Sequence, residues 1–204
     1  MIHITYYGHS CFKVAGDNHS VLFDPYEDGS VPGISLPKDI SVDMVYCSHN
    51  HHDHNASHLV QSKNIELFSN KVITVPHDDK NGKLRGVNDI HIIEVEGKKI
   101  VHFGDIGRLL TTDELRQLTN IDIIMIPVGG YYTIDVHQAK QIINDLNPKL
   151  TILMHYRNGN IGYDVLSSLE EIKKVIPNIN ECPSEITMDL GTNTNIIITM
   201  DIKQ

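Results

Sequence analysis

The stretch "SHNHHDHNAS", residues 48–57, places four histidines and one aspartate within six positions, from His49 to His54. It follows the apolar run "DMVYCS", which is typical of a buried strand. Each neutral imidazole offers one nitrogen lone pair, and a divalent first-row metal binds about four or more donors. The stretch therefore predicts half of a metal site at the end of a strand.

The spacing H-x-H-x-D-H favours two metals over one. A loop leaving a strand can aim His49 and His51 in one direction and Asp53 and His54 in another. We expect His52, the unmatched member, to face solvent or to support the others. A polar surface turn is the alternative interpretation, and the metal site is favoured because the spaced donors follow a buried strand.

One turn cannot saturate two metals, so further ligands must come from elsewhere in the chain. Three candidates each end an apolar run: His77 in "VITVPHDD", Asp105 in "IVHFGDIG" and His155 in "LTILMHY". Taken singly, they would be a loop histidine, a turn carboxylate and a core histidine. Strand ends that meet at one sheet edge commonly build sites in α/β folds, and a carboxylate such as Asp105 can bridge two cations. Together, the three residues are predicted to complete the site.

These motifs resemble those of the metallo-β-lactamase superfamily, in which H-x-H-x-D-H is followed by a later His, Asp and His. The segments "YYGHSCF", "LFDP", "SHNHHDH", "RGVN", "FGDIG", "IPVGGYYTID" and "MHY" carry the resemblance, which spans most of the chain. They look most like a branch of small metal-dependent hydrolases similar to L-ascorbate 6-phosphate lactonase. The resemblance implies an α/β fold, a four-layer αββα sandwich with the metals in a cleft at one edge of two sheets.

The resemblance also implies how the ligands divide. Its motif positions give His49, His51 and His77 to the first metal, Asp53, His54 and His155 to the second, and Asp105 to both. Asp24, in "LFDP", would support a ligand loop by hydrogen bonding. The two divalent ions would be zinc first, with manganese or iron as alternatives. The third motif, "VPHDDKNG", departs from the "GHTPG" type of the glyoxalase-like and lactamase-like branches, so their substrates do not carry over.

The chemistry of two cations sharing one water predicts a hydrolase, because they lower the pKa of that water toward about 7. We expect a hydroxide bridging the metals to cleave a small ester, lactone or phosphodiester, including anionic ones. His9, in "YGHSCF", is a candidate substrate contact or proton donor, and Arg85 and Tyr132 are candidate binders of an anion or leaving group. A non-catalytic metal-binding or ligand-sensing protein and a di-iron redox enzyme remain the alternatives.

Composition bounds the remaining predictions. With 204 residues and no linker-like segment, the chain is expected to form one domain over 1–204. A net charge of -9 argues against an extended nucleic-acid surface and leaves a small-molecule substrate as the expected partner. The N-terminus lacks a signal-peptide pattern, no apolar run approaches a membrane span, and three widely spaced cysteines suit a reducing compartment. We therefore expect a cytoplasmic protein of undetermined oligomeric state.

Hydrophobic patterning predicts a strand-rich first half and alternating strands and helices from about residue 112. A helix is also expected after the histidine cluster, with Asn55 as its N-cap. The irregular loop 25–39 is expected to lie over a site. The expected strands are 2–6, 11–15, 20–23, 43–47, 72–75, 90–95, 99–103, 121–128, 150–155, 185–190 and 195–200, and the later helices are 112–119, 135–146 and 163–176.

Overall fold

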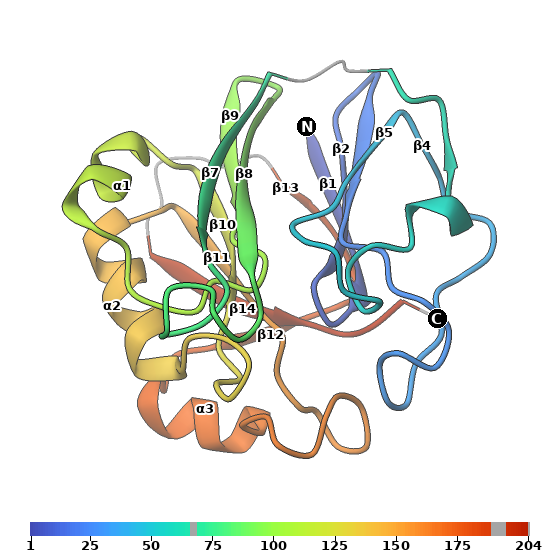
Figure 1. Ribbon diagram of the computed structural model, residues 1–204. Coiled ribbons are helices and arrows are strands. Elements are labelled where there is room, and N and C mark those ends of the chain that lie inside the picture. Colours follow the sequence, from blue (N-terminus) through green and yellow to red (C-terminus); the bar gives the residue numbers. More distant parts are fainter. Residues whose placement is uncertain (66–68, 189–194, 204) are drawn as a thin grey trace.

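The computed structural model describes residues 1–65, 69–188 and 195–203, and two large sheets form the framework of this part of the chain (Figure 1). The first sheet has the strand order β13-β1-β2-β3-β5. Its strands are β1 (Ile2–Gly8), β2 (Cys11–Ala15), β3 (Ser20–Phe23), β5 (Met44–Tyr46) and β13 (Glu185–Met188). The predicted antiparallel meander of β1, β2 and β3 is present, and β5 joins β3 in parallel. The chain therefore leaves β3 and β5 at the same edge of the sheet.

The second sheet has the order β12-β14-β11-β10-β9-β8-β7. Its strands are β7 (Asn70–Pro76), β8 (Val87–Val95), β9 (Lys98–His102), β10 (Ile123–Pro127), β11 (Leu150–Met154), β12 (Asn180–Cys182) and β14 (Ile196–Met200). Strands β9, β10, β11, β14 and β12 run parallel, whereas β7 and β8 pair antiparallel at one side. Every residue of β10 and β11 is buried, which explains their continuously apolar sequences.

Three helices cover the outer face of the second sheet (Figure 1). They are α1 (Thr112–Gln117), α2 (Val136–Leu146) and α3 (Leu169–Val175). Each begins with a capping box, in which the side chain before the helix accepts a backbone N–H and a Glu or Gln three residues later returns the bond. Sequence alone marks these starts well, because the box needs only local residues.

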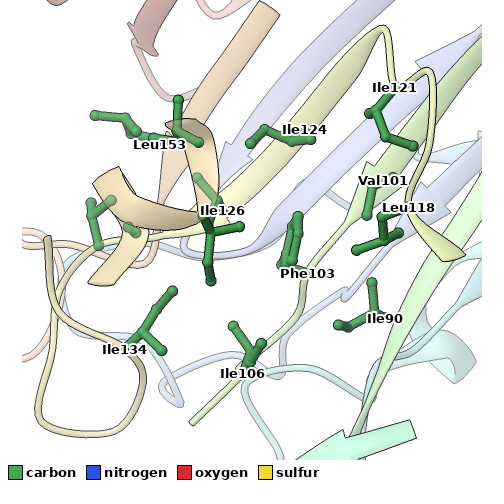
Figure 2. Packing of buried hydrophobic residues seen from close by; sticks show 14 of the residues in the cluster. Ile90, Val101, Phe103, Ile106, Leu118, Ile121, Ile124, Ile126, Ile134 and Leu153 are labelled. Carbon is green, nitrogen blue, oxygen red and sulfur yellow. The ribbon is translucent and has the colours of Figure 1, made fainter. Parts of the chain in front are cut away.

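Two apolar clusters form on the two faces of the second sheet. Between the sheets, side chains such as Phe12 and Phe23 of the first sheet pack with Met125 and Ile152 of the second. Beneath the helices lies another cluster around Phe103 and residues of β8, β10 and β11, shown in close-up in Figure 2. The core is therefore layered, with one sheet buried on both faces.

A third cluster lies on the outer face of the first sheet, where Cys11 and Leu22 are covered by Tyr26, Val31 and Leu36. The covering layer is irregular chain, which includes Val60 directly after the 3-10 turn η1 (Ser57–Leu59). The predicted four-layer sandwich is thus confirmed, with a fourth layer that contains little regular helix. No helix in the described residues is long and apolar enough to cross a membrane.

One predicted helix is absent from the described residues, and another begins later than predicted. Instead of a helix capped by Asn55, the chain makes only η1 and then extends at Val60, because β6 (Gln61–Ser62) pairs in parallel with β4 (Ser41–Val42). The helix predicted from residue 163 begins only after Ser168, whose capping box with Glu171 sets the start. The strand predicted over 185–190 is present as β13 up to Met188, and its last two positions lie outside the described residues.

Candidate metal centre

The predicted donors all follow the carboxyl ends of strands, and they come from both sheets. The histidine-rich turn 48–54 follows β5 in the first sheet. His77 follows β7, Asp105 follows β9 by three residues, and His155 directly follows β11 in the second sheet. Because these strand ends open toward one edge of the sandwich, residues separated by about half of the chain become neighbours.

Asp24 anchors the histidine-rich turn from beneath. It directly follows β3, and its carboxylate accepts hydrogen bonds from the Ser48 backbone N–H at 2.6 Å and from the Ser48 hydroxyl at 2.7 Å. The same carboxylate accepts the Nδ1–H of His54 at 2.8 Å. Since Nδ1 donates, Nε2 of His54 keeps its lone pair and faces the donor cluster. This is the supporting contact expected for Asp24.

One group of donors consists of His49, His51 and His77, whose ligand atoms lie within 4.8 Å of one another. The ring of His49 is 4.5 Å from the ring of His51 and 4.5 Å from that of His77, measured between centroids. Three imidazoles at this separation supply three of the donors that a tetrahedral zinc site requires. The group matches the set predicted for the first metal.

Asp105 connects this group with the remaining donors. Its Oδ2 atom lies 3.3 Å from Nε2 of His54, 3.5 Å from Nε2 of His77 and 3.3 Å from Nε2 of His155. Two ligands bound at 2.0–2.1 Å with a tetrahedral angle are about 3.3 Å apart. The spacing around Asp105 therefore fits atoms that could bind a common cation.

A second group joins Asp53, His54 and His155 with His9, again with ligand atoms within 4.8 Å. Nε2 of His9 lies 3.2 Å from Oδ2 of Asp53, and because a carboxylate can only accept, His9 donates this hydrogen bond. The hydroxyl of Tyr163 lies 3.2 Å from the same oxygen. Protein contacts thus gather on Oδ2 of Asp53, and Oδ1 has no such contact among the described residues.

Several buried polar atoms of the cluster have no hydrogen-bond partner among the described residues. They include Nε2 of His49, Nε2 of His54 and Oδ1 of Asp105. Burying unpaired polar atoms costs about 1–3 kcal/mol each, so a cluster of them fits a site that binds a cation. Nitrogen and carboxylate donors with free lone pairs fit zinc, manganese or iron, and the donor set accommodates divalent cations.

The electrostatics of the cluster point the same way. Burial alone would lower the pKa of His54, but the carboxylates of Asp105 and Asp24 raise it well above its usual range. Burial would raise the pKa of Asp105, but the imidazoles of His155 and His54 hold it well below its usual range. Protonated His54 would carry its second proton on Nε2, facing Asp105, and a cation binding at Nε2 would displace that proton.

Asp105 is held in place by a residue that sequence reasoning missed. The backbone N–H of Asp105 donates to Oδ1 of Asn88 at 2.6 Å, and Nδ2 of Asn88 donates to the carbonyl of Phe103 at 2.8 Å. Between them, Gly104 has φ +53, and a Cβ there would lie 2.2 Å from Oδ1 of Asn88. Only glycine lets the chain pass Asn88 this closely.

A cavity of about 260 Å³ opens over the cluster. It is lined by the donors His51, Asp53, His77, Asp105 and His155 and by Arg85, Tyr132 and Tyr163. A larger hollow of about 610 Å³ runs along residues 29–38, but it contains none of the clustered donors, so the chemistry belongs to the smaller cavity.

The predicted substrate residues divide into two kinds. Arg85 and Tyr132 line the cavity, with the guanidinium carbon of Arg85 5.2 Å from the centre of the Tyr132 ring. His9 is buried behind Asp53 and does not line the cavity. His52 faces solvent, as expected, and lies 3.3 Å from a Glu27 oxygen. The side chain of His9 therefore contacts the metal-ligand candidate Asp53 and is not among the residues that line the cavity.

Tyr163 is the other cavity residue that the sequence did not reveal. It lies in the segment predicted to be helical, and its hydroxyl donates to the carbonyl of Ser30 at 2.5 Å. This bond brings the irregular loop 25–39, expected to lie over a site, against the rim of the cavity. The ring of Tyr163 meets Tyr132 edge-on at 5.6 Å. No local signal at residue 163 indicated these partners, which are far away in the sequence.

Comparisons with known proteins agree with this description. A family model described as the β-lactamase superfamily domain matches residues 3–155. A metal-dependent hydrolase of Methanocaldococcus jannaschii is 29% identical over 218 residues, covering 87% of this chain and 98% of the relative. One of Thermococcus onnurineus is 25% identical over 211 residues, covering 86% and 92%. A crystal structure from Thermotoga maritima, provisionally described as a Zn-dependent hydrolase of the metallo-β-lactamase superfamily, is 26% identical, with full coverage of both chains and a TM-score of 0.80.

Proposed function

The chain is a metal-dependent hydrolase of the metallo-β-lactamase superfamily, and from this membership we propose that it binds two divalent ions at its histidine-rich edge. The proposed reaction is hydrolysis of a small ester, lactone or phosphodiester. Zinc is the first candidate metal, with manganese and iron as alternatives, because imidazole and carboxylate donors suit all three.

One observation carries the proposal of two ions. Oδ2 of Asp105 lies 3.3–3.5 Å from the Nε2 atoms of His54, His77 and His155. His77 also belongs to the group with His49 and His51, whereas His54 and His155 belong to the group with Asp53. A single carboxylate is thus adjacent to both groups, which is the arrangement that a bridging ligand needs.

Two divalent cations, when bound, lower the pKa of a water that they share and polarise the bond under attack. The protein's own residues orient the metal ligands and shape the cavity. Asp24 fixes the orientation of the His54 ring, and Asn88 fixes the backbone of Asp105. Tyr132 and Tyr163 limit the space beside the donors, and a volume of about 260 Å³ suits a small molecule.

Metal analysis and a substrate screen test the proposal. Purified wild-type protein is expected to contain close to two equivalents of metal and to hydrolyse at least one member of a panel of lactones, carboxylic esters and phosphodiesters. Asp105→Ala and His51→Ala should lose metal and activity together. His52→Ala is the matched control, because His52 lies in the same turn but faces solvent.

The outcomes separate the alternatives. Full metal content and full activity in both Asp105→Ala and His51→Ala would show that the site assignment is wrong. Stoichiometric metal without turnover of any substrate would indicate a non-catalytic metal-binding or ligand-sensing protein. Two bound irons with visible absorption, and no hydrolysis, would indicate redox chemistry at the same donors.

A further inference from the structure

Arg85 is carried into the cavity by a tightly built loop. The carboxylate of Asp78 accepts four backbone N–H groups, from Lys80, Gly82, Leu84 and Arg85, at 2.7–3.0 Å. The backbone N–H of His77 donates to the carbonyl of Gly86, which closes the loop at its base. The backbone position of Arg85 relative to His77 is therefore fixed by hydrogen bonds. The side chain of Arg85, which lines the cavity, extends from this ordered loop.

The guanidinium of Arg85 is held by stacking alone. It lies over the ring of Tyr132, 5.2 Å from its centre, and Tyr132 is in turn braced by the rings of Tyr131 and Tyr163. Within the described residues, no hydrogen bond or ion pair uses any of its N–H groups. By contrast, the guanidinium of Arg108 forms a bidentate pair with the carboxylate of Glu114. The five N–H donors of Arg85 thus remain available to a ligand.

Charge makes Arg85 stand out further. Among the described residues lining the cavity it is the one Lys or Arg, and the carboxylates of Asp53 and Asp105 line the same cavity. The chain as a whole carries a net charge of -9, which disfavours nonspecific binding of anions. Bound divalent ions would offset the two carboxylates and leave Arg85 as additional positive charge in the cavity.

The space beyond Arg85 is also open. A second cavity of about 320 Å³ shares Arg85 and Tyr132 with the first and continues past Tyr131 and Thr133. The stacked pair therefore lies where the two cavities meet. A ligand held by Arg85 can reach the metal donors on one side and extend into the second cavity on the other.

From these observations we infer that Arg85 binds an oxyanion, a carboxylate or a phosphate, that belongs to the substrate but is separate from the bond being cleaved. The planar fork of a guanidinium matches both anions, and the stacking on Tyr132 sets its orientation in advance. The inference rests on the proposed function for the identity of the bond that is cleaved. Recognition of the anion depends on Arg85 itself.

A binding experiment on metal-loaded protein tests the inference without requiring turnover. Glycerol phosphate and glutarate serve as the anionic probes, and glycerol and glutaramide as their neutral counterparts, in calorimetric titrations. Arg85→Met is the test variant. Lys83→Met is the matched control, because Lys83 is an exposed cation of the same loop that does not line the cavity. Metal content and melting temperature are measured for every variant.

We expect at least one anionic probe to bind wild-type protein about tenfold or more tightly than it binds Arg85→Met, with Lys83→Met unchanged. The probe that responds identifies the oxyanion as a phosphate or a carboxylate. Arg85→Lys, which keeps the charge but not the fork, should bind with intermediate affinity. Equal affinity of both anions for wild type and for Arg85→Met at equal metal content would overturn the inference, because the metals alone would then account for binding.

The result is separable from the proposed function. If no ester, lactone or phosphodiester is hydrolysed but anion binding still depends on Arg85, the proposed reaction fails and the anion site stands. If hydrolysis occurs and the anions bind independently of Arg85, the reaction stands and the anion site fails.

Discussion

Nε2 of His9 lies 3.2 Å from Oδ2 of Asp53, while the backbone carbonyl of His9 accepts the N–H of His155 at 2.9 Å. One residue in the β1–β2 turn therefore contacts a donor of the histidine-rich turn with its side chain and a donor of the second sheet with its backbone. Burial, and to a smaller extent the neighbouring imidazole of His155, lowers the pKa of His9 to about 4. The ring is thus neutral near pH 7 and carries one N–H for Asp53.

Removing this side chain should weaken one metal more than the other. His9 has φ +56, which asparagine tolerates, so His9→Asn removes the contact with Asp53 and keeps the backbone. In a zinc titration against a chelator, we expect the second equivalent to bind about tenfold more weakly and the first to be unchanged. His3→Asn, at an exposed position of β1, is the control. Equal weakening of both equivalents would mean that His9 supports the fold rather than Asp53.

Asp24 should control metal affinity through His54. Asp24→Asn keeps the size of the side chain and tolerates its φ of +44, but the carboxylate that accepts from Ser48 and His54 is lost. Loss of such a supporting carboxylate lowers metal affinity by roughly 10–100-fold. The same chelator titration measures it, with the exposed Asp17→Asn as the control. Unchanged affinity in Asp24→Asn would show that the His54 ring is oriented by other contacts.

Asn88 should matter for stability even without metal. Asn88→Ala leaves the N–H of Asp105 and the carbonyl of Phe103 buried without their partner. Each unsatisfied group costs about 1–3 kcal/mol, so the free energy of unfolding should fall by about 2 kcal/mol or more. Urea denaturation of the metal-free protein measures this change. A midpoint identical to that of wild type would contradict the assigned role.

A surface ion pair gives a pH-dependent prediction away from the metal centre. Two hydrogen bonds of 2.8 Å join Arg108 to Glu114, and this pairing lowers the pKa of Glu114 to about 2. The unfolded value is about 4.3, so the stabilisation is fully present above that pH and is lost as the pH falls toward 2. The melting temperature of Glu114→Gln should therefore lie below that of wild type at pH 7, and the difference should shrink between about pH 4.5 and pH 2.

The control for this prediction is Asp113→Asn. Asp113 pairs with Arg116 at 2.9 Å, but both side chains are largely exposed, so the pair contributes little. If Asp113→Asn and Glu114→Gln lowered the melting temperature equally at pH 7, the effect would reflect helix charge rather than the Arg108 pair.

Local sequence patterns were sufficient to place most strands and the ends at which the donors lie. Continuously apolar runs predicted β10 and β11 because both faces of those strands are buried. The histidine-rich turn was recognisable because its donors are adjacent in sequence. His77, Asp105 and His155 could be grouped with it because each ends such a run, and the structure brings them together.

The residues that were missed depend on distant partners. Asn88 reads as one polar residue at the start of β8, and nothing near it in sequence shows that it holds the backbone of Asp105. Tyr163 lies in a segment with a helical pattern, but its contacts with Ser30 and Asp53 come from other parts of the chain. Periodicity describes how a segment packs, and it carries no information about which remote side chain a hydroxyl will reach.

The donors are divided between the sheets: the turn after β5 belongs to one, and the ends of β7, β9 and β11 belong to the other. Cations bound there would therefore connect the two sheets across the apolar core that they share. Removing the cations would weaken the packing of β5 against β11 as well as abolish activity. Under metal starvation, a cell would then hold protein that is both idle and easier to proteolyse, so its abundance would follow its metal supply.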